Sequence, residues 1–497
     1  MKKRPEPGVP PVGSSELHLA AHLFAPARLT LAREWRGRTK AELAERVSKT
    51  AAAIGQFENG RARPDAHTLA TLSLALGVPI GFFARQRTAP LMTIDACHFR
   101  SLRSASQRER KRLLATGTLL CDVLTFLEER VELPAEQISR VAESPQSIDD
   151  IESCAVRVRR AWGLGLGPIP NVVKLLENKG IVVAFIPDDC HEVDAFSAWH
   201  DGRPLVFLVK HKDSTSRTRF DAAHELGHLV MHADVAAGSP ELERQANRFA
   251  SAFLLPRDSF LPECPRTLNW PLFYELKQRW KVSVAALLKR AHDLECLSEA
   301  SYRRAFMRLN QTGERRREPH EPLAEYATLI TQAVEAIADE CPAEDLALAL
   351  AMPSADFRAV AGMPTVLELL HQASALAVQQ DYGAQASMVA GAALEMHLRA
   401  LCMKNGISWN GGGSLSEYTQ AIMRQRSVHS EEISASDAKL IADCIRMRND
   451  AAHGSNLAYT AEEVRLMVDG VRRFVSRSRP SDIHAVVVSG QRCQPDD

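Results

Sequence analysis

The chain has 497 residues, 45% hydrophobic and 25% charged, a core-forming composition that excludes a wholly disordered protein and is too long for one ordinary domain. Lysine plus arginine and aspartate plus glutamate number 61 each, so the zero net charge argues against coating of nucleic acid along the whole chain, although one basic domain remains compatible with it. No run of about 18 apolar residues occurs, and the ten cysteines form no C-x-x-C pair, so we expect a cytoplasmic protein with reduced thiols and no membrane partner.

Helical and strand patterns divide the chain into successive segments, and we predict a mostly α, multidomain fold. The segments are a flexible tail (1–24), a helix-turn-helix bundle (25–88), a helical linker (89–150), a small α+β domain (151–310), a helical connector (311–363), a helical domain (364–479) and a second flexible tail (480–497). The first tail is assigned from its basic, proline- and glycine-rich start, which has no apolar run behind it.

The first bundle has the spacing of a helix-turn-helix. An amphipathic helix is predicted at 39–47, a tight turn at 48–50 and a second short helix at 51–58, which Asn59-Gly60 ends; a further helix stops at Gly77. With F-E-N-G-R at 57–61 and L-G-V-P at 76–79, about sixty residues resemble the XRE/Cro-type repressors, a resemblance that implies DNA binding.

The expected DNA-reading face carries few base-reading side chains. Ala51, Ala52 and Gly55 stand where that family places base contacts, whereas Gln56 could make a bidentate contact to adenine. Phosphates are expected to be held by Lys49, Thr50, Arg61 and Arg63. A helical bundle that contacts protein instead of DNA stays an alternative.

The 151–310 segment mixes strand and helix patterns. Short apolar runs predict strands at 181–186, 195–199 and 205–209, the last two joined by an Asp201-Gly202 turn. Helices are predicted at 172–179, 220–231, 241–255 and between 270 and 310. This order predicts a small α+β unit.

Two histidines on the 220–231 helix have the spacing of a metal site. His224 and His228 lie at i and i+4, so both imidazoles leave one helix face, and imidazole is a preferred zinc ligand. Glu225 between them is placed to take a proton from water at the metal. The alternative is an accidental H-E-x-x-H string, whose odds in such a chain are on the order of a few per cent. The flanking strands and helices favour the zinc site.

A catalytic zinc usually takes a third protein ligand and leaves one position for water. His232 lies eight residues beyond His224, about 12 Å along a continuous helix, so it could join only if the helix broke. Glu243 on the next helix is the better candidate, with Glu241 as the runner-up, because that helix can pack back after a short loop.

These motifs together resemble the ImmA/IrrE family of metallopeptidases. The resemblance rests on D-A-F-S at 194–197, R-F-D-A-A-H-E-L-G-H-L at 219–229, E-R-Q-A-N-R-F-A at 243–250 and F-L-L-P at 253–256, in that order. It implies a zincin-like domain over 151–310, with Zn²⁺ bound by His224, His228 and Glu243 and with Glu225 as general base. Members of the family cleave or inactivate transcriptional repressors. By analogy with other H-E-x-x-H peptidases, the 205–209 strand would be the sheet edge that lines the substrate.

The C-terminal block carries a second motif, R-x-x-x-x-H, at the predicted end of a helix at 438–447. Its surroundings resemble the HEPN-type helical domains over about a hundred residues, which implies an RNA-cutting site in a homodimer. His453 would act as acid and base, Arg448 would balance phosphate charge, and Asn449 would fix the pair. The alternative is a helix end at which Arg448 pairs with an acid and Asn449 caps the helix.

The combined expectation is a zinc-dependent endopeptidase that cleaves a regulatory protein, a repressor or an antitoxin, in a stress or phage-related response, fused to a DNA-binding helix-turn-helix. Two alternatives remain at this stage. In one, the protein is a DNA-binding regulator that uses the peptidase fold as a sensor. In the other, it is a HEPN-type ribonuclease controlled by the peptidase.

Overall fold

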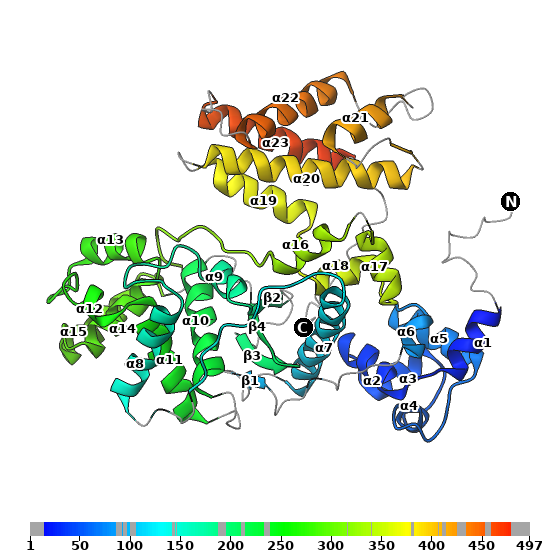
Figure 1. Cartoon of the computed structure of the whole chain (residues 1–497), viewed down its shortest axis with the longest axis horizontal. Helices are drawn as coiled ribbons and strands as arrows, with labels where there is room; N and C mark the ends of the chain where they lie inside the picture. The colour runs from blue at the N-terminus through cyan, green and yellow to red at the C-terminus, as the bar shows by residue number, and fades with distance from the viewer. Residues whose placement is uncertain are drawn as a thin grey trace, which may run out of the picture. The chain divides into compact units, whose positions relative to one another are not determined.

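The computed structural model divides the chain into two compact units, Met1–Met363 and Pro364–Asp497 (Figure 1). It describes residues 14–85, 92, 97–99, 106–141, 145, 147–186, 195–209, 214–232, 239–315, 317–338, 340–378, 382–405, 407–409, 414–424, 434–452 and 459–478. Within these residues no helix is both long and apolar enough to cross a membrane. The tail expected at 480–497 lies outside the described residues.

The N-terminal bundle begins closer to the N-terminus than the sequence predicts. Its helices are α1 Ser14–His22, α2 Pro26–Trp35, α3 Lys40–Arg46, α4 Ala51–Glu58, α5 Ala66–Leu76 and α6 Gly81–Ala84. The flexible tail expected at 1–24 is therefore wrong from Ser14 onward. Ala20 and Phe24 are buried in the core of this bundle, and α1 packs on α5 and α6.

Capping residues fix the helix-turn-helix. Thr39 and Thr50 accept hydrogen bonds from backbone amides of the first turns of α3 and α4. Between these helices Ser48 has a positive φ of 52°, which makes the turn tight. As predicted, α5 stops at Gly77, which adopts the left-handed conformation with φ 60°.

A four-stranded sheet forms the centre of the α+β domain predicted at 151–310. Its strands are β1 Cys97–Phe99, β2 Val182–Ile186, β3 Ala195–His200 and β4 Arg203–Val209, in the order β1-β3-β4-β2. β3 pairs antiparallel with both β1 and β4, whereas β2 and β4 are parallel. β1 lies in a segment predicted to be helical linker, and the sequence analysis missed it.

The position of β4 corrects the prediction that residues 205–209 form a substrate-lining edge. β4 is bonded on one side to β3 and on the other to β2, so it is an interior strand. The analogy failed because the sequence pattern gave strand positions but no strand order. Beside the helix that carries the two histidines, β3 is the strand that could line the substrate.

Each face of the sheet packs against a different core. On one face α7, Gln107–Glu128, covers Phe196, Phe207 and Ala184 and shares a core with the N-terminal bundle. On the other face Val183, Val206 and Leu208 pack into a core that includes α10, Thr215–Met231. The sheet thus separates the N-terminal side of the unit from the side that carries the histidines.

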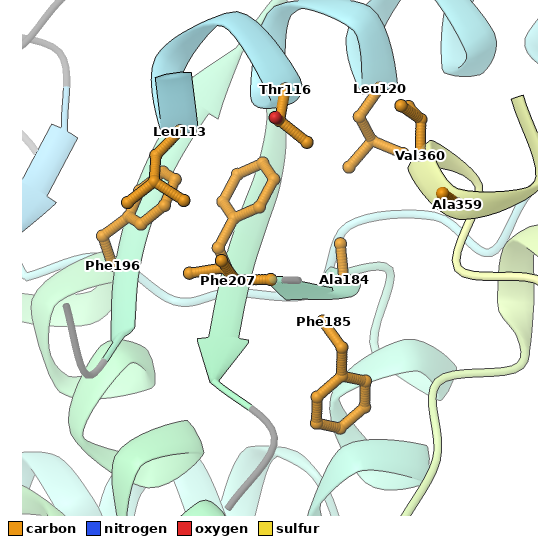
Figure 2. Close-up of a pocket in the computed structure, with 10 residues that line it drawn as sticks. Leu113, Thr116, Leu120, Ala184, Phe185, Phe196, Phe207, Ala359 and Val360 are labelled. Carbon is orange, nitrogen blue, oxygen red and sulfur yellow. The ribbon is translucent and has the colours of Figure 1, made fainter. Parts of the chain in front are cut away.

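A small apolar pocket lies between α7 and the sheet (Figure 2). Leu113, Thr116 and Leu120 project from α7 toward the rings of Phe196 and Phe207, which stack with centroids 4.3 Å apart. The cavity measures about 10 Å³, close to the space that one water needs. We therefore regard it as a packing defect.

Helices surround the second face of the sheet. They are α8 Ile148–Ala161, α9 Val172–Asn178, α10, α11 Pro240–Leu254, α12 Arg257–Phe260, α13 Trp270–Trp280, α14 Val284–Asp293 and α15 Glu299–Gln311. α10 begins five residues before its predicted start because Ser214 caps it by accepting a hydrogen bond from Arg217 N. α10 and α11 pack against each other along the predicted site.

An extended segment, 318–325, ties three helix N-termini together. Glu318 accepts from the first amides of α14, at 2.7 and 3.2 Å, and Glu325 accepts from those of α9, at 2.8 and 3.0 Å. Glu321 accepts from Ser216 in the first turn of α10, at 2.9 Å. Carboxylates at helix N-termini accept hydrogen bonds from amides that have no partner within the helix, and their negative charge interacts favourably with the positive end of the helix dipole. We call this segment the glutamate strap.

The remaining elements are helical. α16 Leu329–Ala336, α17 Ala343–Ala349 and α18 Ser354–Val360 complete the first unit, and their buried residues join the core beneath α7. The second unit contains α19 Val366–Ala377, α20 Gly383–Lys404, α21 Leu415–Arg424, α22 Ala435–Ala452 and α23 Ala461–Arg477. α22 continues to Ala452, so the helix end predicted at residue 447 is wrong.

Candidate metal centre

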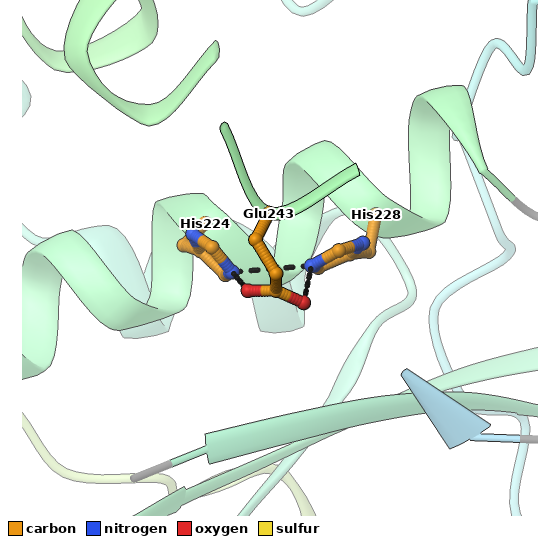
Figure 3. Close-up of side chains that lie close together, drawn as sticks. All are labelled: His224, His228 and Glu243. Carbon is orange, nitrogen blue, oxygen red and sulfur yellow. Dashed lines mark hydrogen bonds and ion pairs between the residues drawn. The ribbon is translucent and has the colours of Figure 1, made fainter. Parts of the chain in front are cut away.

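α10 and α11 bring three potential ligands to one point (Figure 3). The Nε2 atoms of His224 and His228 are 3.1 Å apart, and the Glu243 carboxylate lies 3.2 Å from the first and 3.5 Å from the second. Among the described residues these three side chains form a group able to hold a metal ion. The sequence analysis proposed the same three.

The geometry of this group fits zinc. Zinc ligands stand about 2.0–2.2 Å from the ion, so the corners of their tetrahedron are about 3.3–3.6 Å apart. The 3.1 Å between the two Nε2 atoms lies close to that range, and Oε2 and Oε1 of Glu243 lie 3.2 Å from His224 and 3.5 Å from His228, respectively. With one ligand atom taken from each residue, the three atoms lie within 4.8 Å of one another. Both histidines are buried, whereas the Glu243 side chain is 21% exposed. Two nitrogens and a carboxylate with access on one side are the donor set of a catalytic zinc site.

Hydrogen bonds at the far nitrogens orient both imidazoles. Nδ1 of His224 is 3.2 Å from Oδ1 of Asn247, and Nδ1 of His228 is 3.0 Å from Nδ1 of His232. Nε2 of His232 in turn lies 2.8 Å from Oε1 of Gln245. Such hydrogen bonds fix the orientation of each imidazole ring, so that its Nε2 faces the position of a metal.

The structure also places the two ligand candidates that ranked below Glu243. His232 does not join the cluster but stands behind His228, so its role is to position a ligand. Glu241 is exposed and pairs with Arg244 on the surface of α11. The sequence analysis excluded His232 as a ligand on distance along the helix, and it missed this indirect contact.

Glu225 is fully buried beside the two histidines. Its Oε2 accepts a hydrogen bond of 2.7 Å from Oγ of Ser197, which is also fully buried. Ser197 stands in the middle of β3, so the sheet holds the carboxylate proposed as general base. The sequence analysis noted Ser197 in a family motif but gave it no role.

Electrostatics within the cluster favour an ionised Glu243. Burial opposes the charge, but hydrogen bonds and charge from His224 and His228 hold the pKa of Glu243 well below its usual range. Burial, followed by the charge of His228, lowers the pKa of His232 to about 4. An anionic carboxylate and a neutral supporting imidazole suit a site for a divalent cation.

Close helix packing sets the distance between the ligands on α10 and the ligand on α11. A β-carbon at Gly227 would lie 3.0 Å from Cδ1 of Phe249 and 3.3 Å from its Cβ. Phe249 is fully buried and stands on α11 with Glu243. Gly227 therefore permits the close approach of α11 to α10.

An ion-pair network holds α11 against its neighbours. Arg248 of α11 pairs with Glu152 of α8 at 2.7 Å and with Asp293 of α14 at 3.0 Å. Arg290, which is fully buried, also pairs with Glu152, at 2.5 Å. Burial raises the pKa of Glu152, but the hydrogen bond from Arg290 and the charges of both arginines more than offset this, and the pKa lies below its ordinary value.

The predicted DNA contacts lie at the surface of the N-terminal bundle. Lys49, Thr50, Gln56 and Arg61 are all exposed, around the start and the end of α4. Thr50 also caps α4 through its hydroxyl, at 3.1 Å from Ala53 N. Arg63 is exposed as well, and its guanidinium donates to the carbonyl of His22. The arrangement leaves the predicted phosphate and base contacts accessible.

The structure describes two of the three residues of the predicted ribonuclease site. Arg448 pairs with Glu395 of α20 at 2.5 Å and packs over Gly391, where a β-carbon would stand 2.6 Å from Arg448 Cδ. Asn449 is exposed within α22 and does not cap it. His453 lies outside the described residues. The pairing of Arg448 with an acid matches the structural alternative, and the RNA and homodimer predictions remain untested.

Comparison with known proteins agrees with the two better-defined regions. Residues 29–83 match a helix-turn-helix family, and residues 176–292 match a peptidase family described as the IrrE N-terminal-like domain. No similar curated protein was found for this chain. The second match contains β2, β3, β4, α10 and α11, and therefore the whole candidate centre. The chain thus contains a region similar to the IrrE-like metallopeptidases, preceded by a helix-turn-helix domain.

Proposed function

We propose that the central domain is a zinc-dependent endopeptidase that cleaves a regulatory protein, a repressor or an antitoxin, and that the helix-turn-helix brings it to DNA. The observation that carries this proposal is the convergence of His224, His228 and Glu243, whose ligand atoms lie within 4.8 Å of one another. A stress or phage-related setting and a cytoplasmic location are part of the same proposal.

The chain's own groups have distinct roles in such a reaction. When bound, zinc supplies a Lewis acid that lowers the pKa of water and polarises the peptide carbonyl. Glu225 takes the proton from the attacking water and returns it to the leaving amine. Ser197 holds the Glu225 carboxylate at 2.7 Å, and its donation to one oxygen fixes the direction in which the base faces.

Metal analysis tests the centre directly. The purified full chain is expected to contain about one zinc per chain, and His224→Ala is expected to lose most of it. His371→Ala, an exposed histidine in the second unit, is the matched control and should keep its zinc. Equal zinc in His224→Ala and wild type would show that the metal is bound elsewhere.

Cleavage tests the role of Glu225. The substrate to try first is a small repressor encoded beside this protein's gene, incubated with the zinc-loaded chain and examined by intact mass. Glu225→Gln is expected to keep its zinc and lose the cleavage, because an amide cannot accept the proton. Retained cleavage in this variant would remove Glu225 from the role of base.

The DNA-binding part rests on the exposed face of α4. Phosphate contacts by Lys49 and Arg61 would place the domain on DNA, and Gln56 would supply its base contact. The sparse reading face predicts modest sequence preference. The test is binding to the DNA upstream of the protein's own gene at several salt concentrations, against a scrambled duplex of equal length. Absence of binding to either duplex would exclude the role.

A further inference from the structure

The strand beneath the candidate centre has one edge that the matched peptidase region does not cover. β3 lies directly below the metal cluster, since Ser197 bonds Glu225 at 2.7 Å. On one side β3 pairs with β4, residue by residue from Ala195 to His200. Its other side pairs with β1, in the register Cys97↔Ala198, His98↔Ser197 and Phe99↔Phe196. The centre of that pairing is the residue that holds Glu225.

β1 comes from outside the peptidase region. The family match begins at residue 176, whereas β1 lies at 97–99, between the helix-turn-helix and α7. Among its described residues the matched region contributes three strands, β2, β3 and β4, with β3 at the edge of the three. β1 is also only three residues long, so few backbone hydrogen bonds hold it in place. A short strand added from a distant segment is easily exchanged for another extended segment.

An exposed sheet edge is a common binding site for extended peptides, because the strand's unpaired amides and carbonyls accept another strand. Resting on the proposed function, we propose that this edge of β3 binds an extended, antiparallel segment of the protein substrate, and that Cys97–Phe99 occupies it as an internal competitor. Substrate entry then requires β1 to leave. The three residues of β1 therefore control access to the peptidase.

Two full-length variants hold the β3 edge either covered by β1 or open. Ala198→Cys places a thiol opposite the native Cys97, and directly opposed residues in an antiparallel pair have Cα atoms about 4.5–5.5 Å apart, within the span of a disulfide. Diamide would lock β1 onto β3, and dithiothreitol would release it. His98→Pro with Phe99→Pro opens the edge. Successive amides of a strand point to opposite sides, so this pair removes the donor that faces β3, whichever of the two it is.

The probe is a fluorescent peptide that copies residues 93–103, with serine in place of the cysteine. Its binding is followed by anisotropy in chelator, so that neither hydrolysis nor zinc chemistry affects the result. The proline variant is expected to bind about tenfold more tightly than wild type, and the locked protein about tenfold more weakly than after reduction. Wild type carried through both treatments is the control for the redox reagents, and a scrambled peptide is the control for sequence-independent binding.

Equal binding by the locked, reduced and proline proteins would overturn the proposal, as would no binding to the proline variant. Intact mass confirms the disulfide, and an unchanged circular dichroism spectrum with one cooperative thermal transition confirms the fold of each variant. Zinc content, measured separately on the same samples before chelation, reports on the proposed peptidase. Failure of the edge proposal and failure of the zinc proposal are therefore distinguishable.

Discussion

The contact between Gly227 and Phe249 makes the metal centre sensitive to a single methyl group. In Gly227→Ala the new β-carbon would stand 3.0 Å from the Phe249 ring, so that ring, or α11 with it, must give by a few tenths of an ångström. Phe249 is fully buried, and it shares α11 with Glu243. We therefore expect part of the displacement to pass to the third ligand.

Two opposing effects set the size of the stability change. Replacing glycine by alanine within a helix stabilises it by about 1 kcal/mol. Overpacking a closed core costs about 1–3 kcal/mol. The net destabilisation of the metal-free protein is then at most about 2 kcal/mol. Zinc affinity should fall by about tenfold or more, since small disturbances around a metal ligand commonly cost that much.

The assay combines calorimetry of the metal-free chain with zinc titration against a competing chelator. Adding Phe249→Leu to Gly227→Ala should restore much of the affinity, because the smaller side chain removes the clash. Gly167→Ala is the control, since a β-carbon there meets nothing within 4 Å. If Gly227→Ala binds zinc as tightly as wild type and is no less stable, the proposed link between helix spacing and the centre is refuted.

Three further predictions concern the supports of the site and the DNA-binding face. Arg219→Met should destabilise the fold by about 3–5 kcal/mol, because it leaves Glu325 charged and buried without its ion pair, and adding Glu325→Gln should recover part of the loss in calorimetry. Glu152→Gln should flatten the acid limb of stability against pH. Because the folded-state pKa of Glu152 is depressed, the stability that this carboxylate contributes is complete above the unfolded-state pKa of about 4.3 and is lost as pH falls through the folded-state pKa. An unchanged acid limb in Glu152→Gln would contradict this. Lys49→Ala should weaken binding to all DNA sequences and lower the salt slope by about 1, whereas Gln56→Ala should relax preference at one base pair; identical salt slopes in Lys49→Ala and wild type would exclude the phosphate contact.

The sequence revealed the parts of the centre that depend on local spacing. His224 and His228 are one helical turn apart, so their common face follows from helix geometry alone. Predicting Glu243 as the third ligand required the further inference that the next helix packs back against the helix of the two histidines. The acidic residues in the first turn of that next helix supported this inference. The two helices meet in the structure as that reasoning required.

Contacts between distant segments were harder to foresee. β1 has three residues and no alternating pattern, so nothing in its composition distinguishes it from a linker. The role of Ser197 depends on β3 lying beneath α10, which is a matter of strand order. His232 was correctly placed too far along the helix to be a ligand, yet its ring still reaches the imidazole one turn before it. Side-chain partners of this kind depend on rotamers that a sequence pattern does not specify.

The glutamate strap changes where the peptidase fold ends. The family match stops at residue 292, and the sequence pattern suggests an end near 310, but the carboxylates that cap α14, α10 and α9 come from residues 318–325. A shortened protein that stops at 310 would leave these helix starts without their acceptors, and Arg219 would be buried without a counter-charge. The smallest fragment expected to fold with its centre intact therefore continues through the strap, and domain limits drawn from homology alone would yield an unstable fragment.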